Sequence, residues 1–202
     1  MTDATETAVE ILPEDRARAN CYALIGRLMY GPPDAELLSY IATQRSDDDA
    51  APLAHAWREL QAACRTVPAE EARYEYDDLF IGVGKAPVTL YTAAYAAPQA
   101  PDRHLLSLRD QLDAWQLARR REAGESEDHI SGVCDVMRWL IETGHGLEAE
   151  RAFFYPFVAP AMEPLCSAIG KAPRSQFYRH VAAFMLAFHD VERSGFELMG
   201  EV

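Results

Sequence analysis

The side chains best suited to chemistry in this sequence are aromatic rings placed beside carboxylates. One run covers residues 74–82 and reads YEYDDLFIG, and a second covers residues 88–95 and reads VTLYTAAY. Neither run holds a nucleophile beside a base, a set of metal ligands or a Gly-rich loop for phosphate. Rings and aliphatic side chains fringed by negative charge are suited to gripping a peptide. The pattern therefore favours a binding protein over an enzyme.

The aromatic residues of the two runs differ in how well a helical core accounts for them. Tyr76, Leu79 and Phe80 keep the spacing of one helix face, which by itself is typical of core residues. Tyr91 and Tyr95 are four apart beside a proline-rich stretch, so a core explains them less well. The second pair is thus the stronger candidate for an exposed contact.

The polar pair Asp128 and His129 is a further candidate. We expect Ser126 to cap a helix here, with Glu127 and Asp128 in its first turn, where carboxylates interact favourably with the helix dipole. A histidine beside them can take a proton near neutral pH. On spacing alone, a cap carboxylate beside a solvated histidine explains the pair more simply than a functional site does.

Metal and nucleotide sites are not expected. A carboxylate-bridged two-metal site in a helical bundle needs two Glu-x-x-His pairs, and the sequence offers only Glu142 with His145, across Gly144. The nearest approach to a phosphate loop is the run GVGK at 82–85, which follows a predicted helix and not a strand. We therefore expect no catalytic residue, no metal and no bound cofactor.

Composition excludes several classes of partner. The 202 residues carry 32 acidic and 19 basic side chains, a net charge of -13, which disfavours nucleic acid and anionic membranes and attracts basic partners. The four cysteines form no Cys-x-x-Cys and fit reduced core thiols. The N-terminus does not resemble a signal peptide, and no apolar run approaches the ~20 residues of a membrane span. We expect a cytoplasmic protein without stable membrane insertion.

Hydrophobic periodicity predicts the elements that must position these residues. Nearly every periodic segment has a helical period, so we predict an all-α bundle of about eight helices. We expect a kinked or broken helix at Pro156, Pro160 and Pro164. The predicted helices cover residues 14–30, 35–43, 53–66, 69–82, 105–121, 127–144, 147–169 and a last segment after Pro173.

The chain is predicted to fold as one domain over residues 1–202, with residues 1–12 disordered. Residues 84–102 contain three prolines and form a long connection between N-terminal and C-terminal helical halves. Connections of this length in a compact domain are usually functional or mobile. Such a connection permits either a monomer or a domain-exchanged dimer.

Three motifs in order resemble those of the TorD/DmsD family of redox-enzyme maturation chaperones. The resemblance covers roughly residues 70 to 198, and two positions of the second motif (Leu90, Ala93) and one of the third (Ser126) depart from the family pattern. These departures bear on client preference more than on membership. The motifs are Glu75, Tyr76, Leu79, Phe80 and Gly82; then Leu90-Tyr91-Thr92-Ala93-Ala94-Tyr95; then Glu125-Ser126-Glu127-Asp128-His129.

The resemblance implies a cytoplasmic, non-catalytic chaperone. It would bind the N-terminal leader, often a twin-arginine leader, and the apo form of a molybdenum-cofactor oxidoreductase of the dimethyl-sulfoxide-reductase type until the cofactor is inserted. Carboxylates such as Asp77, Asp78 and Asp128 would meet the leader's arginines. By carry-over of the motifs, the peptide-binding residues are Tyr76, Leu79, Phe80, Tyr91, Tyr95, Asp128 and His129.

Three alternatives stay open at this point. The client is an unexported molybdoenzyme, such as a formate or nitrate dehydrogenase or reductase subunit, recognised without a leader. The chain is a helical nucleotide-binding protein or hydrolase that uses Asp128 and His129. Or it is a helical scaffold in which every aromatic residue belongs to the core.

Overall fold

The structure is a computed structural model, and it describes residues 11–45, 51–82, 84–120 and 123–199. Within these ranges the chain forms nine continuous helical segments, eight of them at least seven residues long, and no strand. The predicted all-α bundle of about eight helices is therefore confirmed. The expectation of disorder over residues 1–12 falls almost wholly outside the described residues.

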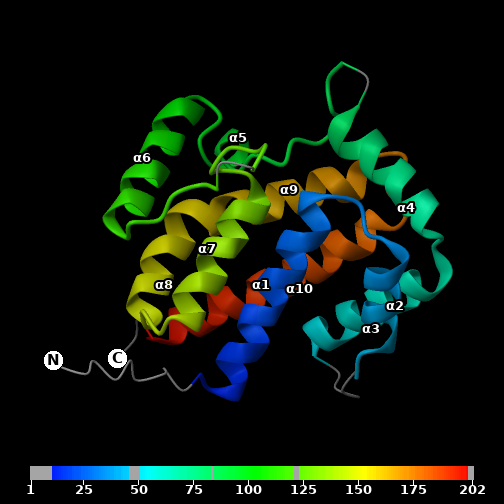
Figure 1. The fold of residues 1–202 in the computed structure, drawn as a ribbon, viewed down its shortest axis with the longest axis horizontal. Helices are drawn as coiled ribbons and strands as arrows, with labels where there is room; N and C mark the ends of the chain where they lie inside the picture. The colour runs from blue at the N-terminus through cyan, green and yellow to red at the C-terminus, as the bar shows by residue number, and fades with distance from the viewer. Residues whose placement is uncertain (1–10, 46–50, 83, 121–122, 200–202) are drawn as a thin grey trace, which may run out of the picture.

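Helices follow one another along nearly the whole described chain (Figure 1). Two π-helical turns, η1 and η2, continue α-helices without a break. The elements are α1 (Pro13–Tyr30), α2 (Ala35–Thr43), α3 (Pro52–Thr66), α4 (Ala69–Tyr76), η1 (Asp77–Ile81), α5 (Ala93–Ala96), α6 (Pro101–Ala114), α7 (Ile130–Glu142), α8 (Leu147–Phe153), η2 (Phe154–Val158), α9 (Ala159–Lys171) and α10 (Tyr178–Met199).

Helices α1 and α10 occupy the centre of the bundle, with α6, α7 and α8 on one side and α2, α3 and α4 on the other (Figure 1). Helix α1 packs chiefly on α7, and α10 packs on α9 and α3. Apolar residues three and four apart make these faces, as in an amphipathic helix. The residues fully buried between α1 and α7 include Ile25, Leu28, Met29, Val133, Met137 and Leu140. Because α1 lies against α7, the two halves of the sequence interleave in space.

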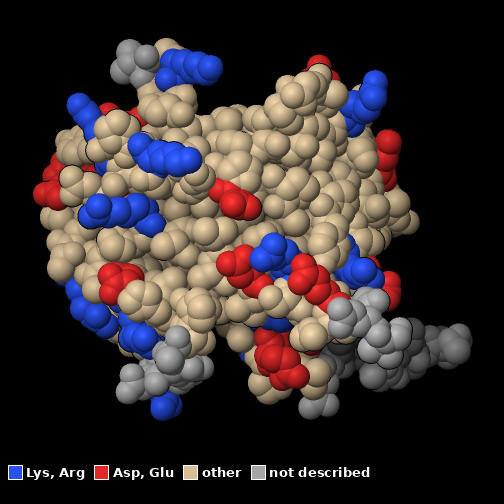
Figure 2. All heavy atoms as spheres, turned by 180° about the vertical axis from the view of Figure 1, so that it is seen from behind, with Lys and Arg blue, Asp and Glu red and all other residues tan. Residues whose placement is uncertain are grey.

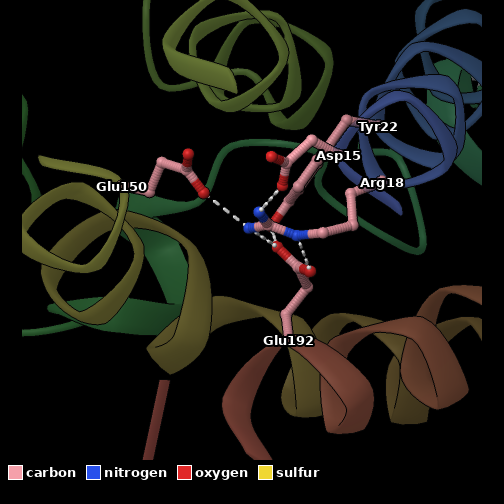
Figure 3. A network of polar contacts seen from close by, with 5 residues as sticks. All are labelled: Asp15, Arg18, Tyr22, Glu150 and Glu192. Carbon is pink, nitrogen blue, oxygen red and sulfur yellow. Dashed lines mark hydrogen bonds and ion pairs between the residues drawn. The ribbon is translucent and has the colours of Figure 1, made fainter. Parts of the chain in front are cut away.

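A buried ionic network joins α1 to α8 and α10 (Figure 3). The Arg18 guanidinium lies 2.9 Å from Asp15, 2.6 Å from Glu150 and 2.7 Å from Glu192. The Tyr22 hydroxyl donates a further hydrogen bond of 2.9 Å to Glu192. Burial raises the pKa of the Glu150 carboxyl, and Arg18 opposes that shift. Three carboxylates thus share one cation in a region with little solvent.

Some predicted helix boundaries were wrong. Helix α6 begins at Pro101, before the predicted start at residue 105 and inside the connection predicted over residues 84–102, which also contains α5. The helix predicted to reach residue 121 ends at Ala114, because Gln116 adopts a left-handed conformation (φ 57°). The N–H groups of Leu117 and Gln116 then bond back to Leu112 and Asp113, which is a Schellman motif. The helix predicted to begin after Ser126 begins at Ile130 instead.

The interruption expected at the prolines takes the form of a π-helical turn. Pro156 lies inside η2, and Pro160 and Pro164 lie inside α9, which continues η2 without a break. The segment Leu147–Lys171 is apolar enough to cross a membrane by length and composition, with a mean hydropathy of 1.2. From the sequence, we had expected no apolar segment of this length. Half of its most apolar window is buried in the fold, as in the core helix of a globular protein.

Charge is unevenly spread over the surface. Figure 2 shows the molecule from behind, with charged side chains gathered along the edges and the lower part of that face. The upper right of the same face, inside its edge, carries few of them. The candidate site described next combines exposed aromatic rings with carboxylates.

Candidate functional site

A single antiparallel bridge joins the second and third motifs. The Thr92 N–H donates to the Asp128 carbonyl at 2.8 Å, and the Ile130 N–H donates to the Leu90 carbonyl at 2.9 Å. These bonds place Tyr91 opposite His129. Residues separated by nearly forty positions are thereby held at the N-terminus of α7.

Tyr91 and His129 are in contact through their rings. The ring centroids are 5.6 Å apart and the planes meet at 81°, an edge-to-face arrangement. The Tyr91 hydroxyl donates to the Glu125 carboxylate at 2.5 Å, and that bond raises the pKa of the phenol to about 12. Tyr91 stays 39% exposed, so part of its side chain is accessible to a ligand.

His129 is the N-cap of α7 and is buried. Its Nδ1 accepts the Ser131 backbone N–H at 3.3 Å and lies 2.7 Å from the Ser131 hydroxyl. A ring nitrogen that accepts from an amide carries no proton, so the proton of the neutral ring is on Nε2. Burial lowers the pKa of His129, while Glu125 and Asp128 act in the opposite direction. The side chain is therefore a neutral ring at pH 7.

The end of α1 supplies a second exposed ring. Tyr30 is 51% exposed and stands edge-on to His129, with centroids 6.4 Å apart and planes at 85°. Buried tyrosine hydroxyls hold this helix end in place: Tyr76 donates to the Met29 carbonyl at 3.1 Å and Tyr178 to the Leu28 carbonyl at 3.3 Å. Carbonyls in the last turn of a helix lack intrahelical partners, and these hydroxyls satisfy two of them.

The first motif shapes the site from beneath. Leu79 and Phe80 are buried in the core, and the Phe80 ring packs between Tyr76 and Tyr178. The π-helical turn η1 adds a residue to the helix and so turns two neighbouring side chains inward. Gly82 ends this turn with φ +64°, and a Cβ there would lie 3.0 Å from the Lys85 carbonyl oxygen. A glycine is needed at that position.

Glu75, the acid of the first motif, has a structural partner. Its carboxylate accepts the backbone N–H groups of Gln176, Phe177 and Tyr178 at 2.7–2.9 Å. It therefore caps the start of α10 from another helix, with a charge favoured by the dipole. The contact fixes α4 to α10 and sets Tyr76 beside Tyr178.

The remaining predicted residues lie at different depths. Tyr95 is half-buried and donates from its hydroxyl to the Thr89 carbonyl at 2.9 Å, which closes the turn that carries Tyr91. Asp128 is buried, and its carboxylate accepts from the Ser126 hydroxyl. Ser126 therefore bonds a carboxylate and does not cap the helix as predicted.

Asp78 faces a separate hollow of about 520 Å³ between α3, α4 and the turn before α10. Its carboxylate lies 2.5 Å from Arg174 across the opening, and both side chains are well exposed. Asp77 instead points to solvent near Tyr76, since its charge raises the pKa of that phenol. The two neighbouring acids thus serve different surfaces.

The structure brings Tyr76, Tyr91, Asp128 and His129 together, while Leu79, Phe80 and Tyr95 support them. It adds two residues that sequence reasoning did not place in the site, Tyr30 and Glu125. Glu125 belongs to the third motif and could have been selected for its charge. Nothing in the sequence links Tyr30 to residues that follow it by more than forty positions. Within the described residues, no group of three His, Cys, Asp or Glu side chains is arranged to hold a metal ion.

A family model described as the nitrate reductase delta subunit matches residues 46–167, which is more than half of the chain. The chain belongs to this family. The resemblance to the TorD/DmsD chaperones is thereby confirmed, and members of the family are maturation chaperones and not catalysts. No curated protein matches the chain.

The nitrate reductase delta subunit family match contains all three motifs, whereas Tyr30 and α10 lie outside it. A solved structure with a similar fold is described as a redox enzyme maturation protein from Archaeoglobus fulgidus. The two share 18% identity over 93% of this chain and 98% of the other, with a TM-score of 0.52. At that identity the likeness concerns the fold alone.

Proposed function

We propose that this member of the nitrate reductase delta subunit family is a cytoplasmic chaperone for a molybdenum-cofactor oxidoreductase of the dimethyl-sulfoxide-reductase type. It binds the N-terminal leader and the apo form of that enzyme, and holds them until the cofactor is inserted and export begins. The observation that carries the proposal is the His129 cluster, which consists of Tyr30, Tyr91, Glu125 and His129. It brings two exposed tyrosine rings, a neutral imidazole and a carboxylate to one place on the surface.

The chemistry of the cluster suits a leader that combines basic and apolar side chains. Tyrosine rings offer large, rigid contact area and a polar edge, and so they bind peptides at a low cost in conformational entropy. The net charge of -13 steers a basic segment toward the protein and makes binding sensitive to salt. The same cluster also serves a client without an export leader, provided its N-terminus carries such residues.

The experiment is a pull-down from the native cytoplasm, followed by calorimetry with the N-terminal peptide of the captured molybdoenzyme subunit. We expect binding at micromolar concentration that weakens in salt and is lost when Tyr91→Ala and Asp128→Asn are combined. Tyr40→Ala removes a more exposed tyrosine elsewhere and serves as the control. If the subunit is captured but its N-terminal peptide does not bind, the protein recognises the folded apoenzyme instead of the leader. If the folded double variant binds the peptide with unchanged affinity, the proposed binding site is wrong.

A further inference from the structure

We propose that Tyr30 and Glu125, together with Tyr91, form a subsite selective for an arginine guanidinium of the client's N-terminal segment. This inference rests on the proposed function and deepens it, because it assigns one group of the peptide to three residues of the chain. Two of the three were not among the predicted site residues. Charge, exposure and ring geometry each support it.

Within the described residues, the carboxylate of Glu125 has no cationic partner. Tyr91 donates to its Oε2, and within the described residues no Lys, Arg or His nitrogen lies within 4.0 Å of it. The neighbouring acid, Glu127, is paired instead, with Arg109 at 2.9 Å and Arg119 at 3.9 Å. Arg119 reaches Glu125 only at the backbone carbonyl. The Oε1 atom is left to accept from a ligand.

The two exposed rings complete a site for a planar cation. The Tyr30 and Tyr91 rings both lie nearly perpendicular to the buried His129 ring, and both side chains are exposed to solvent. The faces of tyrosine rings attract cations through the ring quadrupole. His129 adds no positive charge at neutral pH, because burial lowers its pKa. The positive charge of Arg119, which bonds the Glu125 carbonyl, is paired with Glu127 at 3.9 Å.

Negative potential at the cluster extends beyond Glu125. Burial raises the pKa of the Tyr76 phenol, and the charges of Glu125 and Asp77 raise it further, so both acids act on this part of the structure. Asp77 is exposed and forms no ion pair within the described residues. By contrast, the Asp128 carboxylate is buried and occupied by Ser126, so it is poorly placed to meet an arginine directly.

A guanidinium fits this arrangement better than an ammonium does. It is planar, stacks on aromatic faces, sheds water more readily and presents two N–H groups to one carboxylate. A lysine in the same position would keep the charge and lose the stacking and the second hydrogen bond. The expected signature is a preference for arginine over lysine at equal charge.

The test uses three synthetic peptides that share one alanine–leucine stretch, preceded by Arg-Arg, Lys-Lys or Ala-Ala. Calorimetry on the full chain should show the Arg-Arg peptide binding about tenfold more tightly than the Lys-Lys peptide, the difference expected for one bidentate, stacked contact. Glu125→Gln and Tyr30→Leu should each reduce that ratio to near one. Glu142→Gln, an exposed acid at the far end of α7, and Tyr40→Leu are matched controls that should preserve it.

The outcomes separate the subsite from the proposed function. Equal affinity for the Arg-Arg and Lys-Lys peptides, or a ratio that survives in both folded variants, overturns the subsite. If the Ala-Ala peptide binds as tightly as the Arg-Arg peptide, the subsite is wrong while leader binding stands. If the chain binds none of the three peptides or the client's own N-terminal peptide, both proposals are wrong.

Discussion

The carboxylate of Glu75, on α4, lies 2.7 Å from the backbone nitrogen of Tyr178, the first residue of α10. From the sequence, Glu75 had no expected role beyond its place in the first motif. The structure shows it turned inward to the start of another helix, where it satisfies three backbone donors. The acid of this motif is thus part of what builds the site.

Glu75→Ala should destabilise the protein by about 1–3 kcal/mol, because it leaves half-buried donors at the start of α10 without a charged acceptor. Urea unfolding measures the change. Glu71→Ala, an exposed acid on the same helix, is the control and should change stability by less than about 0.5 kcal/mol. Equal losses in the two variants would show that the inter-helix cap contributes nothing.

Arg18→Met should cost about 3–5 kcal/mol, because it leaves Glu150 and Glu192 buried without their cation. Thermal and chemical unfolding should agree on this loss. Arg27→Met provides the comparison, since its pair with Asp34 is exposed and 3.6 Å long, and it should be nearly neutral. A near-neutral result for Arg18→Met would mean that the two glutamates take up protons without cost to the fold.

Leu79→Ala and Tyr91→Ala should separate support from contact. Leu79 is fully buried, so its truncation should lower the unfolding free energy by about 2–5 kcal/mol. Tyr91 is partly exposed, so its truncation should leave the fold intact and abolish peptide binding. Circular dichroism with calorimetry distinguishes the two effects. Unfolding of the Tyr91→Ala variant would instead favour a scaffold whose aromatic residues are all structural.

Stability should fall as the pH drops below 6.5, in part because of His129. Burial lowers the pKa of His129 in the folded protein, so the unfolded chain takes up the proton first. The neutral His129 ring contributes its full stabilisation of the fold at pH values above its ordinary pKa of 6.5. This stabilisation is lost as the pH falls toward the lowered pKa of the folded protein.

His129→Gln should flatten this pH dependence without removing it, because burial lowers the pKa of His104 and His189 in the same direction. Glu150, with a raised pKa, contributes the opposite slope above its ordinary value of 4.5. The difference between variant and parent isolates His129, and unfolding curves at several pH values measure it. If the unfolding free energy changed with pH in the same way in both proteins, His129 would not be a group that takes up a proton on unfolding.

Much of the fold could be predicted because a helix is marked by local sequence patterns, namely the spacing of apolar residues and the residues that end it. Apolar spacing and the run Gly31-Pro32-Pro33 gave the ends of α1 and the start of α2 nearly to the residue. The end of α6 was predicted too late because it depends on the left-handed backbone of Gln116. Glutamine is not a residue type from which that conformation is expected. The displaced start of α7 depended on a bridge to Leu90, a contact that local patterns do not encode.

The candidate site was predictable where a motif marks it and hidden where only packing does. Tyr91 and His129 were selected from sequence and prove to be neighbours. Tyr30 is brought to them by the packing of α1 on α7, which no spacing rule reveals. The inward turn of Leu79 and Phe80 follows from a π-helical turn that an ordinary helical wheel does not represent.

The late position of α10 in the sequence affects when the candidate site can form during synthesis. This 22-residue helix follows the other described elements in the chain, yet its first residue, Tyr178, donates to a carbonyl in the last turn of α1, close to Tyr30. Contacts between residues so distant in sequence form late and slowly. A nascent or truncated chain that lacks α10 therefore displays no finished candidate site.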